Sequence, residues 1–166
     1  MHHYIQEQNA ITMNSKRLIG SACIIVLLIF LLYRIPVIQV HLDEETFYLK
    51  EDRFELSWIH SVENEKWFEV YEKDGEDLFL SETYFKTYGA GVPADGEVIH
   101  SDDGYVHMKM NRSIPELNIS VSNNVKTKIH TEEKTIDLYK LAQEYESVSI
   151  SIEQLHLWEY IGGTFK

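Results

Sequence analysis

The sequence predicts a mainly β protein, an antiparallel β-sandwich or barrel-like sheet with one packed helix, preceded by an N-terminal transmembrane helix. Three observations lead to this fold class. An uncharged apolar run fills residues 18–33, alternating apolar and polar residues dominate the rest of the chain, and two Asp-Gly dipeptides separate pairs of alternating segments. The 166 residues therefore divide into a short cytoplasmic N-terminus at 1–17, a transmembrane anchor at 18–40 and an extracytoplasmic β domain at 41–166.

Composition narrows the class of function. The 27 acidic and 15 basic residues give a formal net charge of −12, which disfavours binding to nucleic acid because an acidic surface repels phosphates. The content of 44% hydrophobic and 25% charged residues is typical of a globular chain and not of a disordered one. The single cysteine, Cys23, excludes an intramolecular disulfide framework and a zinc site made of several thiolates.

Residues 18–33 contain no charge and lie between Lys16 and Arg17 on one side and Arg34 on the other. As a helix they rise about 24 Å, and the following apolar residues can extend the run toward the roughly 30 Å of a bilayer core. The run ends in bulky residues, whereas a signal-peptidase site needs small ones, so an uncleaved anchor is favoured. A buried core helix is the alternative, and the absence of a polar face on the run disfavours it.

The charges around this run set the expected orientation. Lys16 and Arg17 precede it, whereas residues 41–166 carry 26 acidic and 12 basic side chains. Because positive charge stays on the cytoplasmic side, we expect a single-pass protein of the cell membrane with its C-terminal domain outside the cytoplasm. The membrane is then one partner, contacted through the N-terminal helix.

The β domain is expected to contain a strand at 53–60, where four positions share one face: Phe54, Leu56, Trp58 and His60. A hairpin follows, because Asp74-Gly75 favours a two-residue turn between strands at 67–73 and 76–85. That turn places three cross-strand pairs on one face: Tyr71 with Leu78, Glu69 with Leu80, and Trp67 with Glu82. Glu69 and Glu82 would then be diagonal neighbours.

The remaining elements follow from the same patterns. Asp103-Gly104 predicts a second hairpin with Ile99, Ser101, Val106, Met108 and Met110 facing inward. Its strands and the other expected elements are strands at 97–101, 106–110, 117–122 and 147–160, and one amphipathic helix at 136–145 with Thr135 as its N-cap.

Four features occur in order within residues 58–93: His60-Ser61-Val62-Glu63 at a strand end, Glu69-Val70-Tyr71 on the next strand, Glu82-Thr83-Tyr84-Phe85, and the loop Gly89-Ala90-Gly91-Val92-Pro93. Through them, residues 54–110 resemble a bacterial family called domain of unknown function 1850. The resemblance implies a small anchored or exported protein, and many members are encoded beside TAXI-type TRAP transporters, which take up organic acids with a separate binding protein. A transporter permease or its solute-binding protein is the partner that the resemblance implies.

We expect His60, Glu69 and Glu82 to form one polar cluster beside the glycine loop. A carboxylate among aromatic residues needs a partner, and His60 can donate from either ring nitrogen. The candidate residues for binding a ligand or partner are His60, Ser61, Glu63, Glu69, Tyr71, Glu82, Gly89, Gly91 and Pro93.

Three interpretations of this cluster stay open. It is a polar network that fixes strand register, a ligand or partner site, or a catalytic site with a carboxylate as base and His60 as acid. No nucleophile motif or phosphate loop supports catalysis, so we expect no catalytic residues and no cofactor. His100 and His107 would face each other across the second hairpin and could hold zinc or copper, but Lys109 shares their face and no third ligand is evident, so no metal is expected.

The sequence thus predicts a non-enzymatic, membrane-anchored accessory protein of a solute uptake system, the TAXI-type TRAP transporter. An exported β module that binds a small ligand or a metal, unrelated to transport, is the alternative. An enzyme is the third possibility.

Overall fold

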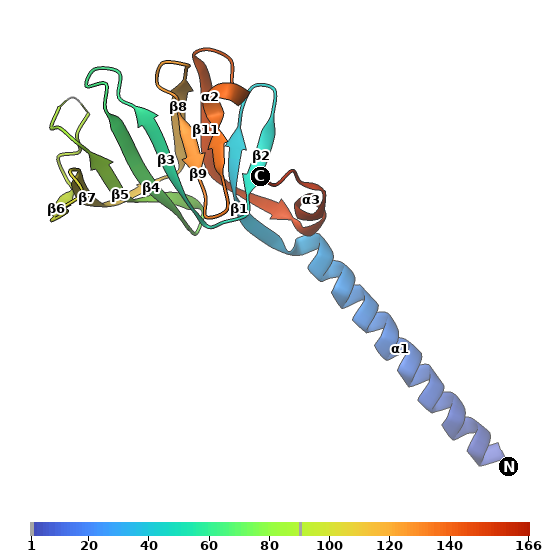
Figure 1. Cartoon of the computed structure of the whole chain (residues 1–166). Helices are drawn as coiled ribbons and strands as arrows, with labels where there is room; N and C mark the ends of the chain where they lie inside the picture. Colours follow the sequence, from blue (N-terminus) through green and yellow to red (C-terminus); the bar gives the residue numbers. More distant parts are fainter. Residues whose placement is uncertain (1, 90) are drawn as a thin grey trace. The chain divides into compact units, whose positions relative to one another are not determined.

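The computed structural model describes residues 2–89 and 91–166, with side chains from Arg17 onward. The chain forms two compact units, one of Met1–Ile35 and Leu155–Gly162 and the other of Pro36–Gln154 and Gly163–Lys166. In chain order (Figure 1) the elements are α1 His2–Leu32, β1 Arg34–His41, β2 Thr46–Leu49, β3 Arg53–Ile59, β4 Lys66–Asp74, β5 Asp77–Phe85, β6 Glu97–Ile99, β7 Val106–Ile114, β8 Glu116–Val121, β9 Lys128–His130, β10 Thr135–Asp137, α2 Leu138–Leu141, β11 Glu146–His156 and α3 Leu157–Gly162.

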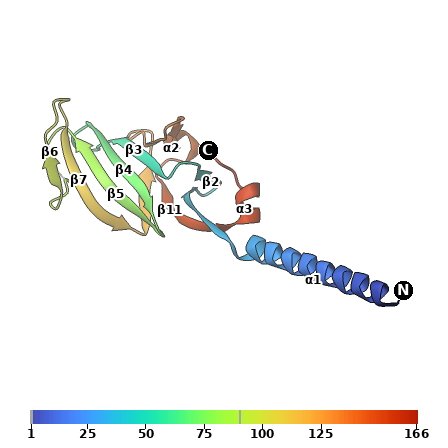
Figure 2. The same cartoon turned by 90° about the horizontal axis from the view of Figure 1, so that it is seen from below.

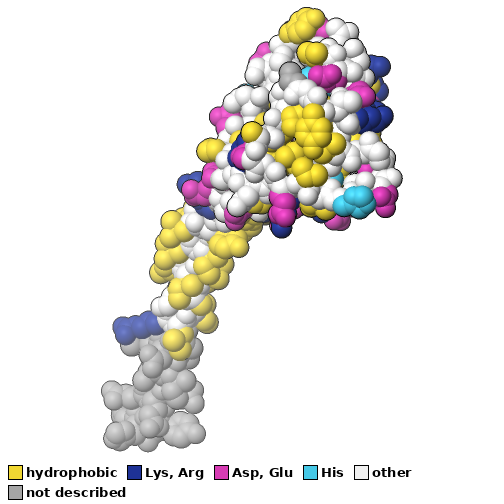
Figure 3. Space-filling model, turned by 90° about the vertical axis from the view of Figure 1, so that its left-hand side faces the viewer, with side chains coloured by type: hydrophobic (Ala, Val, Ile, Leu, Met, Phe, Trp, Pro, Cys, Tyr) yellow, Lys and Arg dark blue, Asp and Glu magenta, His cyan; other side chains and the backbone are white. Residues whose placement is uncertain are grey.

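The smaller unit contains α1 and α3. Apolar side chains cover the described part of α1 and are exposed, as Figure 3 shows. Phe30 of α1 contacts Trp158 of α3, with ring centroids 5.7 Å apart. Within the described residues, no helix has both the length and the hydropathy required to cross a membrane.

The predicted end of the anchor differs from the structure. Helix α1 ends at Leu32 and strand β1 begins at Arg34, so residues 34–40, predicted to extend the anchor, belong to a sheet. The physical reason is burial, because Ile38 and Val40 are 1% and 0% exposed in the core of the β domain. Their apolar character serves the protein core.

The larger unit, the β domain, is built of two sheets. One has the strand order β2-β1-β11-β8, and the other has the order β10-β9-β3-β4-β5-β7-β6. Figure 2 shows the part of the second sheet that runs from β3 to β6. The pairings β3–β4, β4–β5, β5–β7 and β8–β11 are antiparallel, which confirms the predicted mainly antiparallel β architecture. The chain passes from one sheet to the other at Pro115, which has no N–H to continue a ladder.

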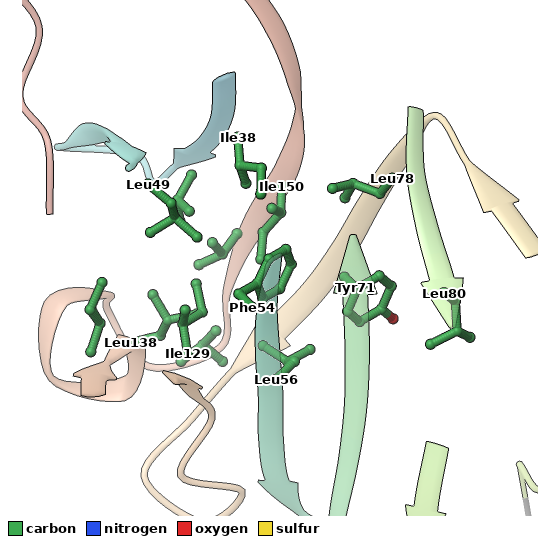
Figure 4. Close-up of a cluster of buried hydrophobic side chains, with 14 of the residues drawn as sticks. Ile38, Leu49, Phe54, Leu56, Tyr71, Leu78, Leu80, Ile129, Leu138 and Ile150 are labelled. Atoms are coloured by element: carbon green, nitrogen blue, oxygen red, sulfur yellow. The ribbon is translucent and has the colours of Figure 1, made fainter. Parts of the chain in front are cut away.

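One hydrophobic core joins both sheets. Phe54, Leu56 and Tyr71 contribute from the seven-stranded sheet, and Ile38 and Ile150 from the four-stranded sheet (Figure 4). Phe54 stacks on Tyr71 with ring centroids 5.2 Å apart. The predicted alternation of the first strand is confirmed, since Phe54 and Leu56 are buried on its inner face.

The predicted helix at 136–145 is wrong in extent. Only Leu138–Leu141 is helical, and Thr135, predicted as the N-cap, lies in β10 opposite His130. Pairing with β9 buries Ile136, so a strand contact overrides the helical periodicity. Tyr145, the last residue of the predicted helix, has a φ of 66° and is exposed.

The first predicted hairpin exists, with its turn one residue later than expected. Asp74 pairs with Asp77, so the turn residues are Gly75 and Glu76, and Gly75 takes a φ of 63°, which glycine adopts without strain. The register then shifts again, because Tyr71 pairs with Leu80 but Val70 pairs with Glu82. Ser81 is thus an extra residue, and this β-bulge reverses the faces of the residues that follow it.

Candidate functional site

A cavity of about 410 Å³ lies in the β domain and takes its lining from segments far apart in the chain. Its size is within the range of small-molecule sites. Strands β3, β4 and β8 and the turn after β3 supply most of the lining, which consists of Leu56, Trp58, His60, Ser61, Trp67, Glu69, Gly91, Ile119, Ser120, Val125 and Thr127.

Aromatic rings form one wall of this cavity, and the alternation of β3 and β4 places them there. Trp58 and Trp67 are opposite each other in the β3–β4 register, with ring centroids 5.9 Å apart. Trp67 also stacks on His60 at 5.0 Å, toward β3, and on Phe85 at 5.1 Å, toward β5. Trp67 is therefore buried and packed against rings on both sides, whereas Trp58 is only partly buried.

Glu69 supplies the carboxylate of the cavity. It lies on the same face of β4 as Trp67 and Tyr71, and the hydroxyl of Tyr71 donates a hydrogen bond of 2.5 Å to Glu69 Oε2. Burial raises the pKa of Glu69, and the Tyr71 hydrogen bond and the charge of Arg112 oppose this rise. Burial and the neighbouring Glu69 charge raise the pKa of Tyr71, so its hydroxyl stays a donor.

His60 and the glycine loop form the end of the cavity. The backbone N–H of Glu63 donates to His60 Nδ1 at 3.3 Å, which closes the turn after β3. The Glu63 side chain lies against Gly89, where any Cβ would collide with the Glu63 carboxylate. Gly91 has a φ of 84° and approaches His60 Nε2, since a Cβ at position 91 would lie 4.0 Å from that atom.

The structure brings together four of the nine predicted site residues, because His60, Ser61, Glu69 and Gly91 all line the cavity. Three others lie next to the lining. Glu63 and Tyr71 donate hydrogen bonds to His60 and Glu69, and Gly89 lies against the Glu63 side chain. Pro93 lies further along the loop, outside the described lining. Ala90, within the predicted loop, is outside the described residues.

The predicted cluster of His60, Glu69 and Glu82 is wrong in its third member. Glu82 pairs with Val70 and lies on the outer face of the sheet, opposite to Glu69. The later turn and the bulge at Ser81 cause this change of face. The described hydrogen bonds of His60 and Glu69 go to different partners, so these two residues share a cavity without a direct bond.

On the outer face Glu82 has its own partners. The Tyr84 hydroxyl donates to Glu82 Oε2, and the Tyr84 ring stacks on His107 with centroids 4.1 Å apart. His107 Nε2 lies 3.2 Å from Glu82 Oε2, in an orientation that makes no hydrogen bond. Burial and Glu82 raise the pKa of Tyr84.

The possible metal pair across the second hairpin is not assembled. Ile99 pairs with His107, so the register is one residue away from the predicted pairing of His100 with His107. His100 instead lies 3.1 Å from Asp102, with both side chains exposed. Ile99, predicted to face inward, is 38% exposed. Among the described side chains, no group of three or more His, Cys, Asp or Glu is placed to hold a metal ion.

Several lining residues were missed by sequence reasoning. Trp58 and Trp67 had a usable signal, because they alternate with His60 and Glu69 on neighbouring strands. Ile119, Ser120 and Thr127 had none, because they are more than fifty residues distant from β3 in sequence. Packing of the two sheets brings Ile119 and Ser120 of β8 to the cavity, and pairing of β9 with β3 brings Thr127 there.

Comparison with curated proteins and with solved structures finds no match. A comparison with protein families finds one that matches residues 54–138, about half of the chain and further than the resemblance over 54–110. This range contains β3 except for its first residue, all of β4 to β10, and all lining residues of the cavity. The chain therefore belongs to the family described as Domain of unknown function (DUF1850).

Proposed function

We propose that this protein is a non-enzymatic, membrane-anchored accessory protein of a solute uptake system, and that its β domain binds a small ligand in the cavity beside His60 and Glu69. The observation that carries the proposal is the cavity itself. It combines indole walls with a few convergent polar groups, which is the composition of small-molecule binding sites. The interpretation of the cluster as a ligand site is thus preferred to that of a purely structural network.

The anchor is part of the proposal. Its support is the exposed apolar surface of residues 18–33, which calls for a lipid or protein cover. Lys16 and Arg17 precede this segment and the acidic β domain follows it, an asymmetry typical of a cytoplasmic N-terminus. The anchor would comprise residues 18–33, because β1 begins at Arg34.

Two considerations support a transporter as the partner. One is the family resemblance, and the other is that the proposed binding domain is tethered to the membrane. A ligand-binding domain held at the membrane exterior is suited to contact either the permease or the solute-binding protein of a TAXI-type TRAP transporter. The bacterial origin belongs to the same proposal.

Two variants in one turn test the role of the cavity. Ser61 is exposed at its mouth, so Ser61→Trp should plug it without disturbing the core. Val62, the next residue, is 67% exposed and outside the lining, which makes Val62→Trp the matched control. A strain that lacks this gene should take up isotope-labelled organic acids such as succinate and glutamate more slowly than its parent. The Val62→Trp gene should restore uptake, and the Ser61→Trp gene should not. Restoration by both variants would contradict the proposal.

Partner and topology need separate measurements. A tagged full-length chain, extracted in mild detergent, should co-purify with the transporter permease or its solute-binding protein, and recovery of neither would remove the transporter from the proposal. In intact spheroplasts, added protease should cleave a C-terminal tag. Protection of that tag until the membrane is broken would place the β domain on the other side.

A further inference from the structure

We infer that the cavity beside Trp58 and Glu69 binds a small organic cation, a protonated amine or a quaternary ammonium group on a compact apolar body. The inference rests on the proposed function, because it names the chemical class of ligand for the same cavity. It is carried by one carboxylate, two indole rings and the absence of Lys and Arg among the described lining residues.

The charges around the cavity select the sign of the ligand. His60 and Glu69 are the ionisable side chains among the described lining residues. Arg112 acts on Glu69 through its charge, but its guanidinium donates to both carboxylate oxygens of Asp95, at 2.8 and 3.0 Å. No ion pair described in the structure contains Glu69. A cationic ligand compensates this carboxylate, a neutral ligand leaves it uncompensated, and an anionic ligand is repelled.

The aromatic wall favours the same class of ligand. Indole rings attract cations through their electron-rich faces, and the attraction grows as the site loses water. Trp58 is the partly exposed indole of the wall, whereas Trp67 is 3% exposed and fixed between His60 and Phe85. The apolar lining from Leu56, Ile119 and Val125 suits methyl or methylene groups around the charge.

The carboxylate is oriented before any ligand arrives. The Tyr71 hydroxyl donates to Glu69 Oε2, and Tyr71 is 1% exposed and stacked on Phe54. A fixed carboxylate loses little conformational freedom on binding, which increases affinity for a matching cation. The organic acids carried by TAXI-type transporters have the opposite charge, so the ligand of this cavity is a different molecule from such a cargo.

Tryptophan fluorescence of the full-length chain in mild detergent tests the inference with three probes of similar shape. These are choline, its neutral isostere with a tert-butyl group in place of trimethylammonium, and the anion tert-butylacetate. Two of the three tryptophans line the cavity, so the Trp158→Phe background reports on Trp58 and Trp67 alone. Choline should bind at least about tenfold more tightly than the neutral isostere, a difference of ~1.4 kcal/mol. The anion should bind more weakly than both.

Two variants on the same hairpin identify the carboxylate. Glu69→Gln should reduce the preference for choline over its neutral isostere to about one, whereas Glu82→Gln, on the opposite face, should retain it. Trp58→Leu should weaken choline binding several-fold, and Phe68→Leu, on the outer face of β4, should not. Melting curves of each variant check that it is folded.

The outcomes separate this inference from the proposed function. Equal affinity for cation and neutral isostere, tighter binding of the anion, or no saturable signal with any probe would overturn the assignment of an organic cation. If Ser61→Trp still blocks uptake in that case, the proposed function stands. If Ser61→Trp restores uptake, the proposed function is overturned as well.

Discussion

Two glutamate–tyrosine pairs on one hairpin have the same local chemistry and opposite surroundings. In β4 the Tyr71 hydroxyl donates to Glu69, and in β5 the Tyr84 hydroxyl donates to Glu82, each across two positions of one strand. In the first pair, Glu69 lines the cavity and Tyr71 lies behind it. The second lies on the outer face beside His107.

The difference shows that one extra residue decides which pair can meet a ligand. Without the bulge at Ser81, the alternation of β5 would place Glu82 on the inner face with Glu69. Two carboxylates would then share a buried site, which costs more than one. With the bulge, the inner face keeps one carboxylate, and the outer pair contacts a histidine.

The largest effect should come from the two aromatic neighbours on β4. Trp67 is 3% exposed and supports the cavity wall, so Trp67→Ala should cost about 3–5 kcal/mol of unfolding free energy. Phe68 is half-buried on the outer face against Tyr105, so Phe68→Ala should cost about 1 kcal/mol. Urea denaturation of both variants measures the difference. Equal costs would mean that the two faces of β4 are equally buried.

The second-largest difference is expected between the two tyrosine hydroxyls, in the unfolding free energy lost when each is removed. Tyr71→Phe removes the described hydrogen-bond donor, from a buried ring, to the partly buried Glu69 carboxylate and should cost about 1–3 kcal/mol. Tyr84→Phe removes a bond at the partly exposed outer pair and should cost about 0.5 kcal/mol. Thermal melts at matched pH compare them, and a greater loss with Tyr84→Phe would invert the comparison.

Glu69→Gln should increase the free energy of unfolding at neutral pH by about 0.5–2 kcal/mol. Replacing a charged group that function requires but that destabilises the fold commonly has this effect. Burial raises the pKa of Glu69 in the folded state above its ordinary 4.5, so the folded protein binds this proton more tightly than the unfolded chain does. The wild type thus loses stability as the pH rises from 4.5 through the raised pKa. The advantage of Glu69→Gln should be present above that window and absent below pH 4.5. Melts across this range measure it, and an advantage independent of pH would contradict the assigned cause.

The smallest effect is expected from Glu82→Gln. The Glu82 side chain is 30% exposed, and an amide oxygen can still accept from Tyr84, so the unfolding free energy should change by less than about 0.5 kcal/mol. Chemical denaturation beside Glu69→Gln tests this. A loss above about 1 kcal/mol would show that the outer pair is as essential to the fold as the inner pair.

The parts of this fold that depend on local pattern could be predicted from the sequence. Alternation identified the inner face of β3, and Asp74-Gly75 identified the hairpin. Adjacent residues could not fix the register, because the turn begins at Gly75 and the bulge at Ser81 has no local signature. Backbone pairing with the preceding strand β9 also overrode the helical pattern at 136–145, where Ile136 and Asp137 join β10 and only Leu138–Leu141 form a helical turn.

In the candidate site, too, local pattern predicts some residues and long-range pairing or packing determines the others. His60 and Glu69 could be placed together from the alternation of neighbouring antiparallel strands, and Ser61 came with the family resemblance. The position of Ser120 depends on how the two sheets pack, and that of Thr127 depends on the pairing of β9 with β3. No periodicity within one segment specifies either arrangement.

Uptake by the deletion strain complemented with Glu69→Gln or with Glu82→Gln tests the central claim most directly, that the inner pair belongs to the functional site and the outer pair does not. Both substitutions exchange a carboxylate for an amide on the same hairpin. Equal amounts of each variant in the membrane should be verified first. We predict that Glu82→Gln restores uptake and that Glu69→Gln does not. Restoration by Glu69→Gln to the wild-type level would contradict the claim.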